Sequence, residues 1–574
     1  MIKCLAALVA LALVTQCSAQ SPMPSIVDNQ GRHTLLVDGK PFFILGGQAH
    51  NSSAWPALLP QVWTAIEHMH ANTLEVPVYW EQLEPQEGKF DFSLVDTLLT
   101  QAQAHHTRLV LLWFATWKNG SDHYMPAWMK LQAAKYPNCI GVKGDPIDSP
   151  SPIAVATLEA DKKAFTAFMG YLKKADPNHT VIMVQVENEP GAWGTVRDYS
   201  PAAQRLFEKP VPEALLQPEI RKALGHPDAS VGVRHFGDGT GHPMASDGAA
   251  DAAGSGSIAD GSAHAAAGSW SRVFGADADE YFQAWYVARF IGEVAAAGKA
   301  IYPLPLYVNV ALRDPLTHPT ANTYESGGAT DNVIPIYKVA APAIDLVAPD
   351  IYLPENDKCQ KVIDLYTRPD NALLVPEAAL TGDKTKYLYD VLAHGGIGFS
   401  PFGIDDNGGK SPGAPDSCTA FGEQYALLAP LLPQLAAWAA QGKISALLEP
   451  DDHTDQTTEL DGWQARAIFG AGRGDHRHPN GRSTGKVLII QQDRNTFLVT
   501  GTLARITFKP AAAGGGQGGR AEAGKAWQYL RVEEGSYKDG VFTPSRILNG
   551  DETDWGGPAF GPTPTLIRIT LNTR

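Results

Sequence analysis

Two apolar segments of the sequence each carry a glutamate at or next to their end, and paired carboxylates suit general acid–base chemistry. Val181–Glu189 ends in polar residues before a Pro-Gly pair, and Leu373–Ala378 carries a single carboxylate, Glu377. Hydrolysis of a glycosidic bond needs a carboxylic acid that protonates the leaving oxygen and a second carboxylate on the other side of the anomeric carbon. We expect Glu189 to be the acid, because partial burial raises the pKa of a glutamate toward neutrality.

Two polar residues immediately before Glu189 have other expected uses. Asn188 can hold the 2-hydroxyl of a sugar, a contact that tightens in the transition state. Glu187 shares a face with Glu189 on a regular strand, so both glutamates are candidates for the acid. We prefer Glu189 because it lies nearer the strand end, where a substrate binds; Glu187 would lie deeper in the fold.

Strand-like and helix-like segments alternate from about residue 40 to residue 440. The strand-like segments are short and almost continuously apolar, as expected for strands covered on both faces. Eight such strands are expected, at Phe42–Gln48, Thr73–Trp80, Leu109–Trp117, Val181–Glu189, Leu306–Leu312, Leu346–Tyr352, Leu373–Ala378 and Gly396–Pro401. Eight βα units predict an α/β fold, a closed (β/α)8 TIM barrel, with Glu189 and Glu377 facing each other across its mouth. The alternative, an open doubly wound sheet, usually has a Gly-rich turn after its first strand that Gly46-Gly47 does not match.

The helices of the barrel follow from the segments between these strands. They are expected at Pro56–His70, Ser93–His105, Leu158–Lys174, Glu280–Ala297, Ile334–Ala341, Asp357–Leu365, Lys384–His394 and Gly422–Gln441. The catalytic barrel is predicted over residues 20–442. An insertion at about 225–268, rich in Gly, Ala, Ser, Asp and His, is expected to be a flexible loop or a partial wall of the site.

The remaining sequence divides into a leader and a second domain. Residues 1–19 combine Lys3, an apolar run of about ten residues and small residues at the end, which predicts a signal peptide. The protein is therefore expected to be exported, to the periplasm or the extracellular space; Cys17 leaves a lipoprotein as the alternative. Residues 443–574 lose the helical pattern and predict a C-terminal antiparallel β domain, for which bracing of the barrel and carbohydrate binding are both open.

Composition and charge narrow the partners. The formal net charge is -15, which disfavours nucleic acid, and no other apolar run predicts a membrane span. We expect no metal and no cofactor, because the histidines show no ligand spacing and residues 405–408 lack the full spacing of a calcium loop. The mature chain would keep three scattered cysteines, for which none or one disulfide is expected: Cys139, Cys359 and Cys418.

Several motifs between about residues 35 and 405 resemble those of retaining glycosidases. The Asn-Glu pair on the fourth strand and Glu377 on the seventh are similar to the clan with (β/α)8 barrels. The narrower resemblance is to the β-galactosidases of glycoside hydrolase family 35, with features of family 42, and most to a bacterial branch that trims galactose from xyloglucan oligosaccharides. The motifs are Asp38-Gly39-Lys40-Pro41-Phe42, Gly46-Gly47-Gln48, Trp80 with Leu83-Glu84-Pro85, and Gly88-Lys89-Phe90-Asp91-Phe92.

This resemblance implies an exo-acting enzyme whose substrate is a β-galactoside oligosaccharide. It implies that Glu377 is the nucleophile, that Glu189 is the acid/base, and that Tyr352 hydrogen-bonds the nucleophile. The expected sugar contacts also include Asn309, Gln48, Asn51, Trp113 and Trp117, with barrel packing as the alternative for each. Two other functions are open: an endo-acting mannanase or cellulase of the same clan, and a non-catalytic carbohydrate-binding barrel. Leu83 and Pro190 depart from the family pattern, which leaves the individual sugar contacts open.

Overall fold

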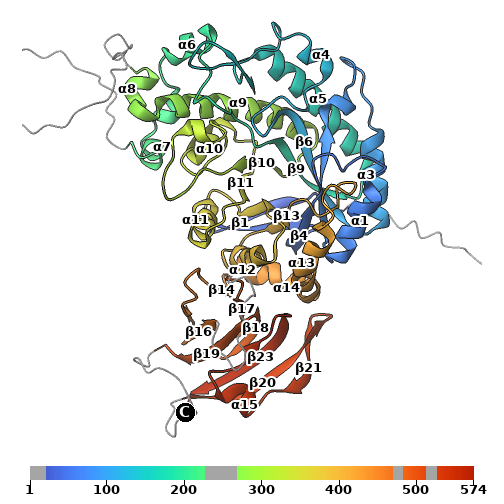
Figure 1. The fold of residues 1–574 in the computed structure, drawn as a ribbon, viewed down its shortest axis with the longest axis vertical. Coiled ribbons are helices and arrows are strands. Elements are labelled where there is room, and N and C mark those ends of the chain that lie inside the picture. Colours follow the sequence, from blue (N-terminus) through green and yellow to red (C-terminus); the bar gives the residue numbers. More distant parts are fainter. Residues whose placement is uncertain (1–20, 227–267, 470–482, 512–526, 574) are drawn as a thin grey trace, which may run out of the picture.

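A computed structural model describes residues 21–226, 268–469, 483–511 and 527–573. Eight parallel strands form a closed barrel in the order β10-β11-β12-β13-β4-β5-β6-β9 (Figure 1). This confirms the predicted (β/α)8 fold. The strands are β4 (Ile44–Gln48), β5 (Thr73–Tyr79), β6 (Arg108–Lys118), β9 (Val181–Asn188), β10 (Leu306–Ala311), β11 (Leu346–Ile351), β12 (Leu374–Ala378) and β13 (Gly398–Pro401).

The barrel strands are buried on both faces, because helices cover the outside and side chains fill the inside. Every residue of β5, β9 and β12 is buried. One long helix follows each strand, and the carboxyl ends of all eight strands meet at one mouth. These helices are α1 (Leu59–His68), α3 (Ser93–Ala104), α5 (Val155–Ala175), α9 (Ala278–Ile301), α10 (Ile334–Ala340), α11 (Asn356–Tyr366), α12 (Thr385–Ala393) and α13 (Ala414–Leu428).

Two sequence predictions about the barrel segments are wrong in detail. Phe42 does not open the first barrel strand; it ends β3 of a three-stranded antiparallel sheet formed by β1 (Ser25–Asn29), β2 (Arg32–Val37) and β3 (Lys40–Phe42), which the sequence reading missed. The predicted helix Gly422–Gln441 is two helices, α13 and α14 (Leu432–Ala440), separated by a 3-10 turn. Pro430 and Pro433 explain the break, since proline lacks the N–H that a continuous helix needs.

Two further antiparallel sheets follow the barrel. The six-stranded sheet has the order β14-β17-β18-β23-β20-β21, and the four-stranded sheet has the order β15-β16-β19-β22. Their facing sides form a second hydrophobic core that includes Trp463, Ile489 and Ile569. The sequence pattern predicts strands at Val487–Gln492, Thr496–Leu503, Ala504–Lys509, Trp527–Glu533 and Thr565–Leu571. They correspond to β17 (Lys486–Gln491), β18 (Thr496–Thr502), β19 (Ala504–Pro510), β20 (Trp527–Lys538) and β23 (Thr565–Thr573). The sequence pattern missed β14 (Ile444–Leu448), β15 (Gln456–Leu460), β16 (Trp463–Phe469), β21 (Val541–Ile547) and β22 (Ala559–Phe560).

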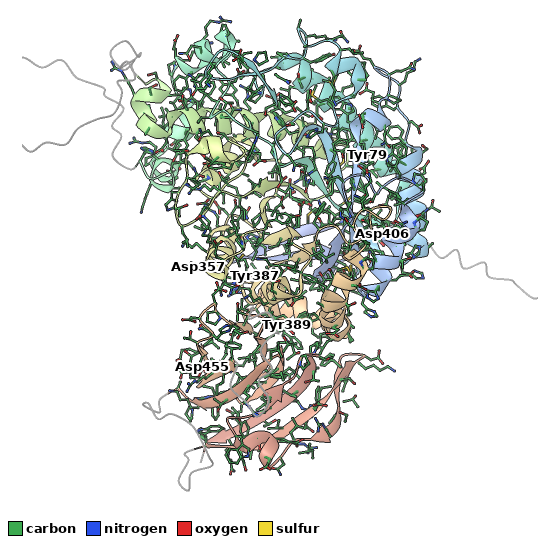
Figure 2. All side chains as sticks on the ribbon, viewed as in Figure 1. Tyr79, Asp357, Tyr387, Tyr389, Asp406 and Asp455 are labelled. Atoms are coloured by element: carbon green, nitrogen blue, oxygen red, sulfur yellow. The ribbon has the colours of Figure 1, made fainter. Side chains whose placement is uncertain are left out.

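Helix α12 joins the barrel to these sheets. Figure 2 shows Tyr387 and Tyr389 of this helix at the junction, where Tyr387 donates to Asn356 Oδ1 at 2.5 Å and Tyr389 to Gln424 Oε1 at 2.8 Å. Lys386 of the same helix donates to the carbonyl of Ser483 at 2.8 Å. Lys486 Nζ of the following sheet donates to Thr385 Oγ1 of α12 at 2.9 Å, so the contacts of two buried lysines hold the C-terminal sheets against the barrel.

Some sequence predictions fall outside the described residues or are untested. The predicted signal peptide and residues 227–267 of the predicted insertion lie outside the described part of the chain. The residue limits of the domains stay predictions. None of the described helices is long and apolar enough to cross a membrane. The cysteines predicted to form one disulfide or none are three buried free thiols: Cys139, Cys359 and Cys418.

Candidate active site

Glu189 follows the last residue of β9 and is held from two neighbouring strands. Its backbone N–H donates to Asn309 Oδ1 of β10 at 2.9 Å, and its carbonyl accepts from the N–H of Gly120, just after β6, at 3.0 Å. Its φ is +43°, so the chain leaves the extended conformation at this residue. The side chain is 6% exposed. These contacts hold a nearly buried carboxyl group at the barrel mouth.

Glu377 lies on β12 and receives a hydrogen bond from a neighbouring loop. Tyr352 Oη, just beyond β11, donates to Glu377 Oε1 at 2.5 Å. Asp350 is paired directly with Glu377 in the β11–β12 register. Glu189, Asp350 and Glu377 each place a carboxylate oxygen within 4.8 Å of the others. The two glutamates predicted on separate strands therefore meet at one point, with a third carboxyl group between their strands.

Burial and mutual repulsion control protonation at this site. Burial, followed by the nearby Glu377 carboxylate, raises the pKa of Glu189 to about 7, while the Lys118 ammonium opposes the shift. Burial and the charges of Glu377 and Glu189 raise the pKa of Asp350 well above its usual range. Asn309 Nδ2 donates to Asp350 Oδ2 at 2.7 Å. Glu189 can therefore hold a proton near neutral pH, as a general acid must.

Glu187 faces a different environment from Glu189. Its Oε2 accepts the backbone N–H of Trp117 at 2.7 Å, and its carboxyl lies against Asp161 of α5, on the outside of the barrel. Burial and Asp161 raise the pKa of Glu187 well above its usual range. The expected shared face fails because Glu187 and Glu189 both have positive φ, +65° and +43°, so the strand alternation is broken. Only Glu189 joins Glu377 at the mouth.

Asn188 and Gln48 offer buried polar atoms to the barrel interior. Among the described residues, neither amide atom of Asn188 has a hydrogen-bond partner, and Gln48 Oε1 has none either. Both side chains are almost completely buried. A buried polar atom without a hydrogen-bond partner destabilises the fold. A sugar hydroxyl can both donate and accept a hydrogen bond, so it could partner these amide atoms. Asn51 lies in the loop after β4, partly exposed, where its carbonyl accepts from Tyr124 Oη at 3.5 Å.

The structure contradicts a sugar-stacking role for Trp113 and Trp117. Both indoles are completely buried. Trp113 stacks on Phe168 of α5 with ring centroids 5.4 Å apart and donates its Nε1–H to Asp161 at 3.0 Å. Trp117 packs edge-on against Phe290 of α9 at 4.8 Å. They pack strands against helices, because a strand buried on both faces has apolar side chains on both.

Three charged residues near the carboxylates were missed by the sequence reading. Glu75 of β5 accepts from Ser400 Oγ at 2.6 Å and from Tyr307 Oη at 3.3 Å inside the barrel, and burial raises its pKa to about 8. Lys118 ends β6, and Glu325 lies beyond β10; the charges of both act on Glu189. A charged residue inside an apolar strand was the available signal for Glu75. Glu325 has no such signal, because it comes from a long loop.

The three carboxyl groups at the mouth could also hold a metal ion, since their oxygens approach closely enough. A catalytic carboxylate pair produces the same arrangement without a metal. Tyr352 donates to one of the three groups, and Glu189, with a pKa of about 7, is partly protonated near neutral pH. Both features weaken cation binding at this site. The cluster is therefore a candidate for acid–base chemistry.

Two family models match separate parts of this chain, and one of them includes part of the site. Residues 55–215 match the family model of glycoside hydrolase family 42, described as "Beta-galactosidase", and residues 421–559 match a "Domain of unknown function (DUF5597)". The first match contains Glu189 and ends before Glu377. It does not confirm the family 35 assignment, because the matched model is that of family 42.

Two curated relatives carry the same name. "Beta-galactosidase" of Xanthomonas manihotis is 28% identical over 212 residues, which cover 35% of this chain and 32% of that protein. "Beta-galactosidase 11" of Arabidopsis thaliana is 31% identical over 104 residues, covering 17% of this chain and 12% of that protein. The matched segments therefore span a third or less of the length of these relatives.

Solved structures with similar folds include β-galactosidases from Bacillus circulans sp. alkalophilus and Rahnella sp. R3. The first is 14% identical, covers 68% of this chain and 57% of its own, and has a TM-score of 0.45. The second is 17% identical, covers 69% and 58%, and also has a TM-score of 0.45. By family model and by curated relatives, this chain is similar to β-galactosidases, and the match to the family model is confined to residues 55–215, which contain β5, β6 and β9.

Proposed function

We propose that this protein is a retaining, exo-acting β-galactosidase that removes terminal β-linked galactose from oligosaccharides or polysaccharides. The observation that carries the proposal is the Glu189–Glu377 pair, whose carboxylate oxygens lie within 4.8 Å. Retaining glycosidases hold their two carboxyl groups about 5–5.5 Å apart, whereas inverting ones separate them by roughly 6.5–9.5 Å. The family 42 match and the named relatives support a galactoside as the substrate.

In the first half of the reaction Glu377 is the nucleophile. Its carboxylate forms a bond to the anomeric carbon of galactose while the bond from that carbon to the leaving oxygen breaks. Glu189 gives its proton to the leaving oxygen, and a pKa of about 7 keeps that proton available near neutral pH. The hydrogen bond from Tyr352 orients the attacking carboxylate. Asn188, with both amide atoms unpartnered among the described residues, is available to the 2-hydroxyl of the sugar.

In the second half the same Glu189 acts as a base. Once Glu377 is esterified it carries no negative charge, so one of the two main causes of the raised Glu189 pKa is removed. The ionised Glu189 then takes a proton from water, and the water oxygen attacks the anomeric carbon as the ester bond breaks. Two displacements at one carbon return the galactose with its original β configuration.

Stereochemistry tests this assignment directly. We expect the NMR spectrum of freshly released galactose to show the β anomer first. In a Glu377→Gly variant, azide would replace the carboxylate in a single displacement, so α-galactosyl azide is the expected product. In a Glu189→Ala variant, azide attacks the covalent intermediate and β-galactosyl azide is expected. Release of α-galactose, or the same azide anomer from both variants, would contradict the proposed roles.

The finer assignments are part of the same proposal. The motifs resemble family 35, and the matched family model favours family 42. A xyloglucan-derived substrate rests on the motif resemblance; comparing galactose release from xyloglucan oligosaccharides, lactose and galactan tests it. An endo-acting enzyme would instead release oligosaccharides, and a non-catalytic barrel would release nothing.

Export is likewise proposed from residues 1–19. The Lys3 charge, apolar run and small residues of this segment support a cleaved signal peptide and a periplasmic or extracellular protein. Cell fractionation and N-terminal sequencing of the mature protein test this. A mature chain that starts near residue 20 outside the cytoplasm is expected, and recovery of full-length chain from the cytoplasm would refute it.

A further inference from the structure

Trp193 is an exposed indole on a rigid loop beside the active site. It lies four residues after Glu189 and is 53% exposed, whereas Trp113 and Trp117 are completely buried. Its backbone N–H donates to Ser149 Oγ at 3.1 Å. The preceding residue, Ala192, exchanges two backbone hydrogen bonds with Ser326, at 2.8 and 3.0 Å. The loop therefore holds a large aromatic side chain at the surface, where its apolar ring and its N–H can contact a ligand.

Gly120 contacts both Trp193 and the backbone of the acid/base residue Glu189. Its N–H donates to the carbonyl of Glu189 at 3.0 Å. A Cβ on Gly120 would meet Glu325 Cγ at 3.1 Å and Trp193 Cβ at 3.4 Å. Since φ of Gly120 is +70°, glycine is also favoured there by its backbone conformation. Trp193 and Glu325 thus both pack against Gly120, whose N–H contacts the backbone of Glu189.

Lys118 and Glu325 add polar groups to the same place. The Lys118 ammonium lowers and the Glu325 carboxylate raises the pKa of Glu189, so both charges lie near its carboxyl group. Both side chains are mostly buried, at 5% and 9% exposure. Lys118 Nζ donates to Asn119 Oδ1 and has two further protons for other acceptors. The Lys118 ammonium can donate hydrogen bonds to sugar hydroxyls, and the Glu325 carboxylate can accept them. The nearby Trp193 indole offers an apolar surface to a sugar ring.

The positions of these residues place them on the leaving-group side of the reaction. Lys118 ends β6, Trp193 follows β9 and Glu325 follows β10, whereas Glu377 lies on β12. The nucleophile attacks one face of the anomeric carbon, and the acid protonates the oxygen that departs from the other. The sugar attached to that oxygen must therefore lie on the Glu189 side.

We propose that Trp193, Lys118 and Glu325 form an aglycone subsite that binds a neutral pyranose linked to the galactose being removed. This inference rests on the proposed β-galactosidase function and names the leaving group. The indole would cover the apolar face of the pyranose, and Lys118 and Glu325 would bind its hydroxyls. The Glu325 carboxylate disfavours an acidic sugar by like-charge repulsion.

The test compares two donors that differ only in their leaving group. β-Galactosyl fluoride has no aglycone sugar, and lactose has a neutral pyranose. Trp193→Ala is expected to lower kcat/KM for lactose about tenfold more than for β-galactosyl fluoride, as the loss of a good aromatic contact implies. Trp555→Ala is the matched control, because Trp555 is 59% exposed but lies between β21 and β22, far along the chain from the barrel strands. It should leave the ratio of the two kcat/KM values unchanged.

A second readout uses the covalent intermediate. With β-galactosyl fluoride as donor and xylose as acceptor, the wild-type enzyme should divide the galactose between water and xylose. Trp193→Ala should reduce transfer to xylose relative to hydrolysis about tenfold, and Trp193→Phe should restore much of it. An unchanged lactose-to-fluoride ratio together with unchanged transfer would overturn the subsite. If the wild-type enzyme hydrolysed neither lactose nor β-galactosyl fluoride, the proposed function itself would be overturned.

Discussion

Replacing Glu189 with glutamine removes the proposed acid and changes little else. Glutamine has nearly the same shape as glutamate, and the contacts that hold residue 189 to Asn309 and Gly120 use its backbone. Glutamine cannot give up a proton in this pH range. The variant therefore isolates proton transfer from the geometry of the site.

The size of the effect follows from the environment of Glu189. With a pKa of about 7, about half of the enzyme carries the proton at pH 7 and roughly a tenth at pH 8. For substrates with poor leaving groups, kcat/KM of the wild-type enzyme should fall about tenfold per pH unit on this basic limb. In Glu189→Gln the basic limb should disappear, and kcat/KM should be about 100- to 10,000-fold lower.

The leaving group separates the two half-reactions in the assay. Lactose needs a proton on its departing oxygen, whereas 2,4-dinitrophenolate leaves without one. With 2,4-dinitrophenyl β-galactoside, Glu189→Gln should form the covalent intermediate at nearly the wild-type rate and hydrolyse it slowly. A burst of dinitrophenol followed by slow turnover is expected, and azide should accelerate the slow phase, because it attacks without a base.

Glu187→Gln is the matched control, since Glu187 is a second buried glutamate two residues away. Its carboxyl contacts the Trp117 backbone and Asp161, so the variant should keep the basic limb. A basic limb that persists in Glu189→Gln and moves in Glu187→Gln would show that Glu187 is the acid. A wild-type basic limb with its midpoint near 4.5 would refute the argument that burial and Glu377 raise the pKa of Glu189.

Four further outcomes are expected. Asn188→Ala should lower kcat/KM for aryl β-galactosides about 10- to 100-fold, but not for the 2-deoxy analogue, because the lost contact is to the 2-hydroxyl. Tyr352→Phe should lower kcat about tenfold or more without lowering the melting temperature, because the donated bond to Glu377 Oε1 is charge-assisted. Trp113→Ala should lower the free energy of unfolding, measured with denaturant, by about 3–5 kcal/mol, because the Trp113 indole is packed on α5. An unchanged free energy of unfolding would contradict this packing role and favour a sugar contact for Trp113. Folding raises the pKa of Glu189 from 4.5 to about 7, so ionisation of Glu189 opposes folding. As pH rises from 4.5 to 7, the free energy of unfolding of the wild type should fall by on the order of 3 kcal/mol relative to that of Glu189→Gln. Below pH 4.5 this pH-dependent difference should vanish, because Glu189 is protonated in both the folded and the unfolded chain.

The barrel and its two principal glutamates could be predicted because their signals are local. Each barrel strand is a short, continuous apolar segment, and the same pattern holds whichever strand pairs with it. Glu189 and Glu377 are recognisable because a carboxylate ends an apolar strand. The C-terminal strands β15 and β21 were missed, since their exposed residues interrupt the apolar alternation. The sheet β1–β3 was missed because most of its residues are half-buried or exposed, so its strands lack the continuous apolar pattern of the barrel strands.

The faces of the barrel strands needed the tertiary structure. A strand buried on both sides carries apolar residues on both, so the sequence does not tell which of them point into the barrel. Trp113 and Trp117 therefore looked like sugar contacts until their packing on α5 and α9 was known. The positive φ of Glu187 and Glu189 reversed the expected relation between them for a similar reason, because regular alternation is a property of extended backbone alone.

The sequence by itself determined the fold class, the strand ends and the two carboxylates, since each depends on neighbours along the chain. Only the tertiary structure decided that Glu189 rather than Glu187 faces Glu377, that Asp350 lies between their strands, and that Trp193, Lys118 and Glu325 gather beside the acid. Those residues come from different strands and loops that the closed barrel brings to one mouth. Their pKa values and contacts depend on distances across space, which spacing along the chain does not encode.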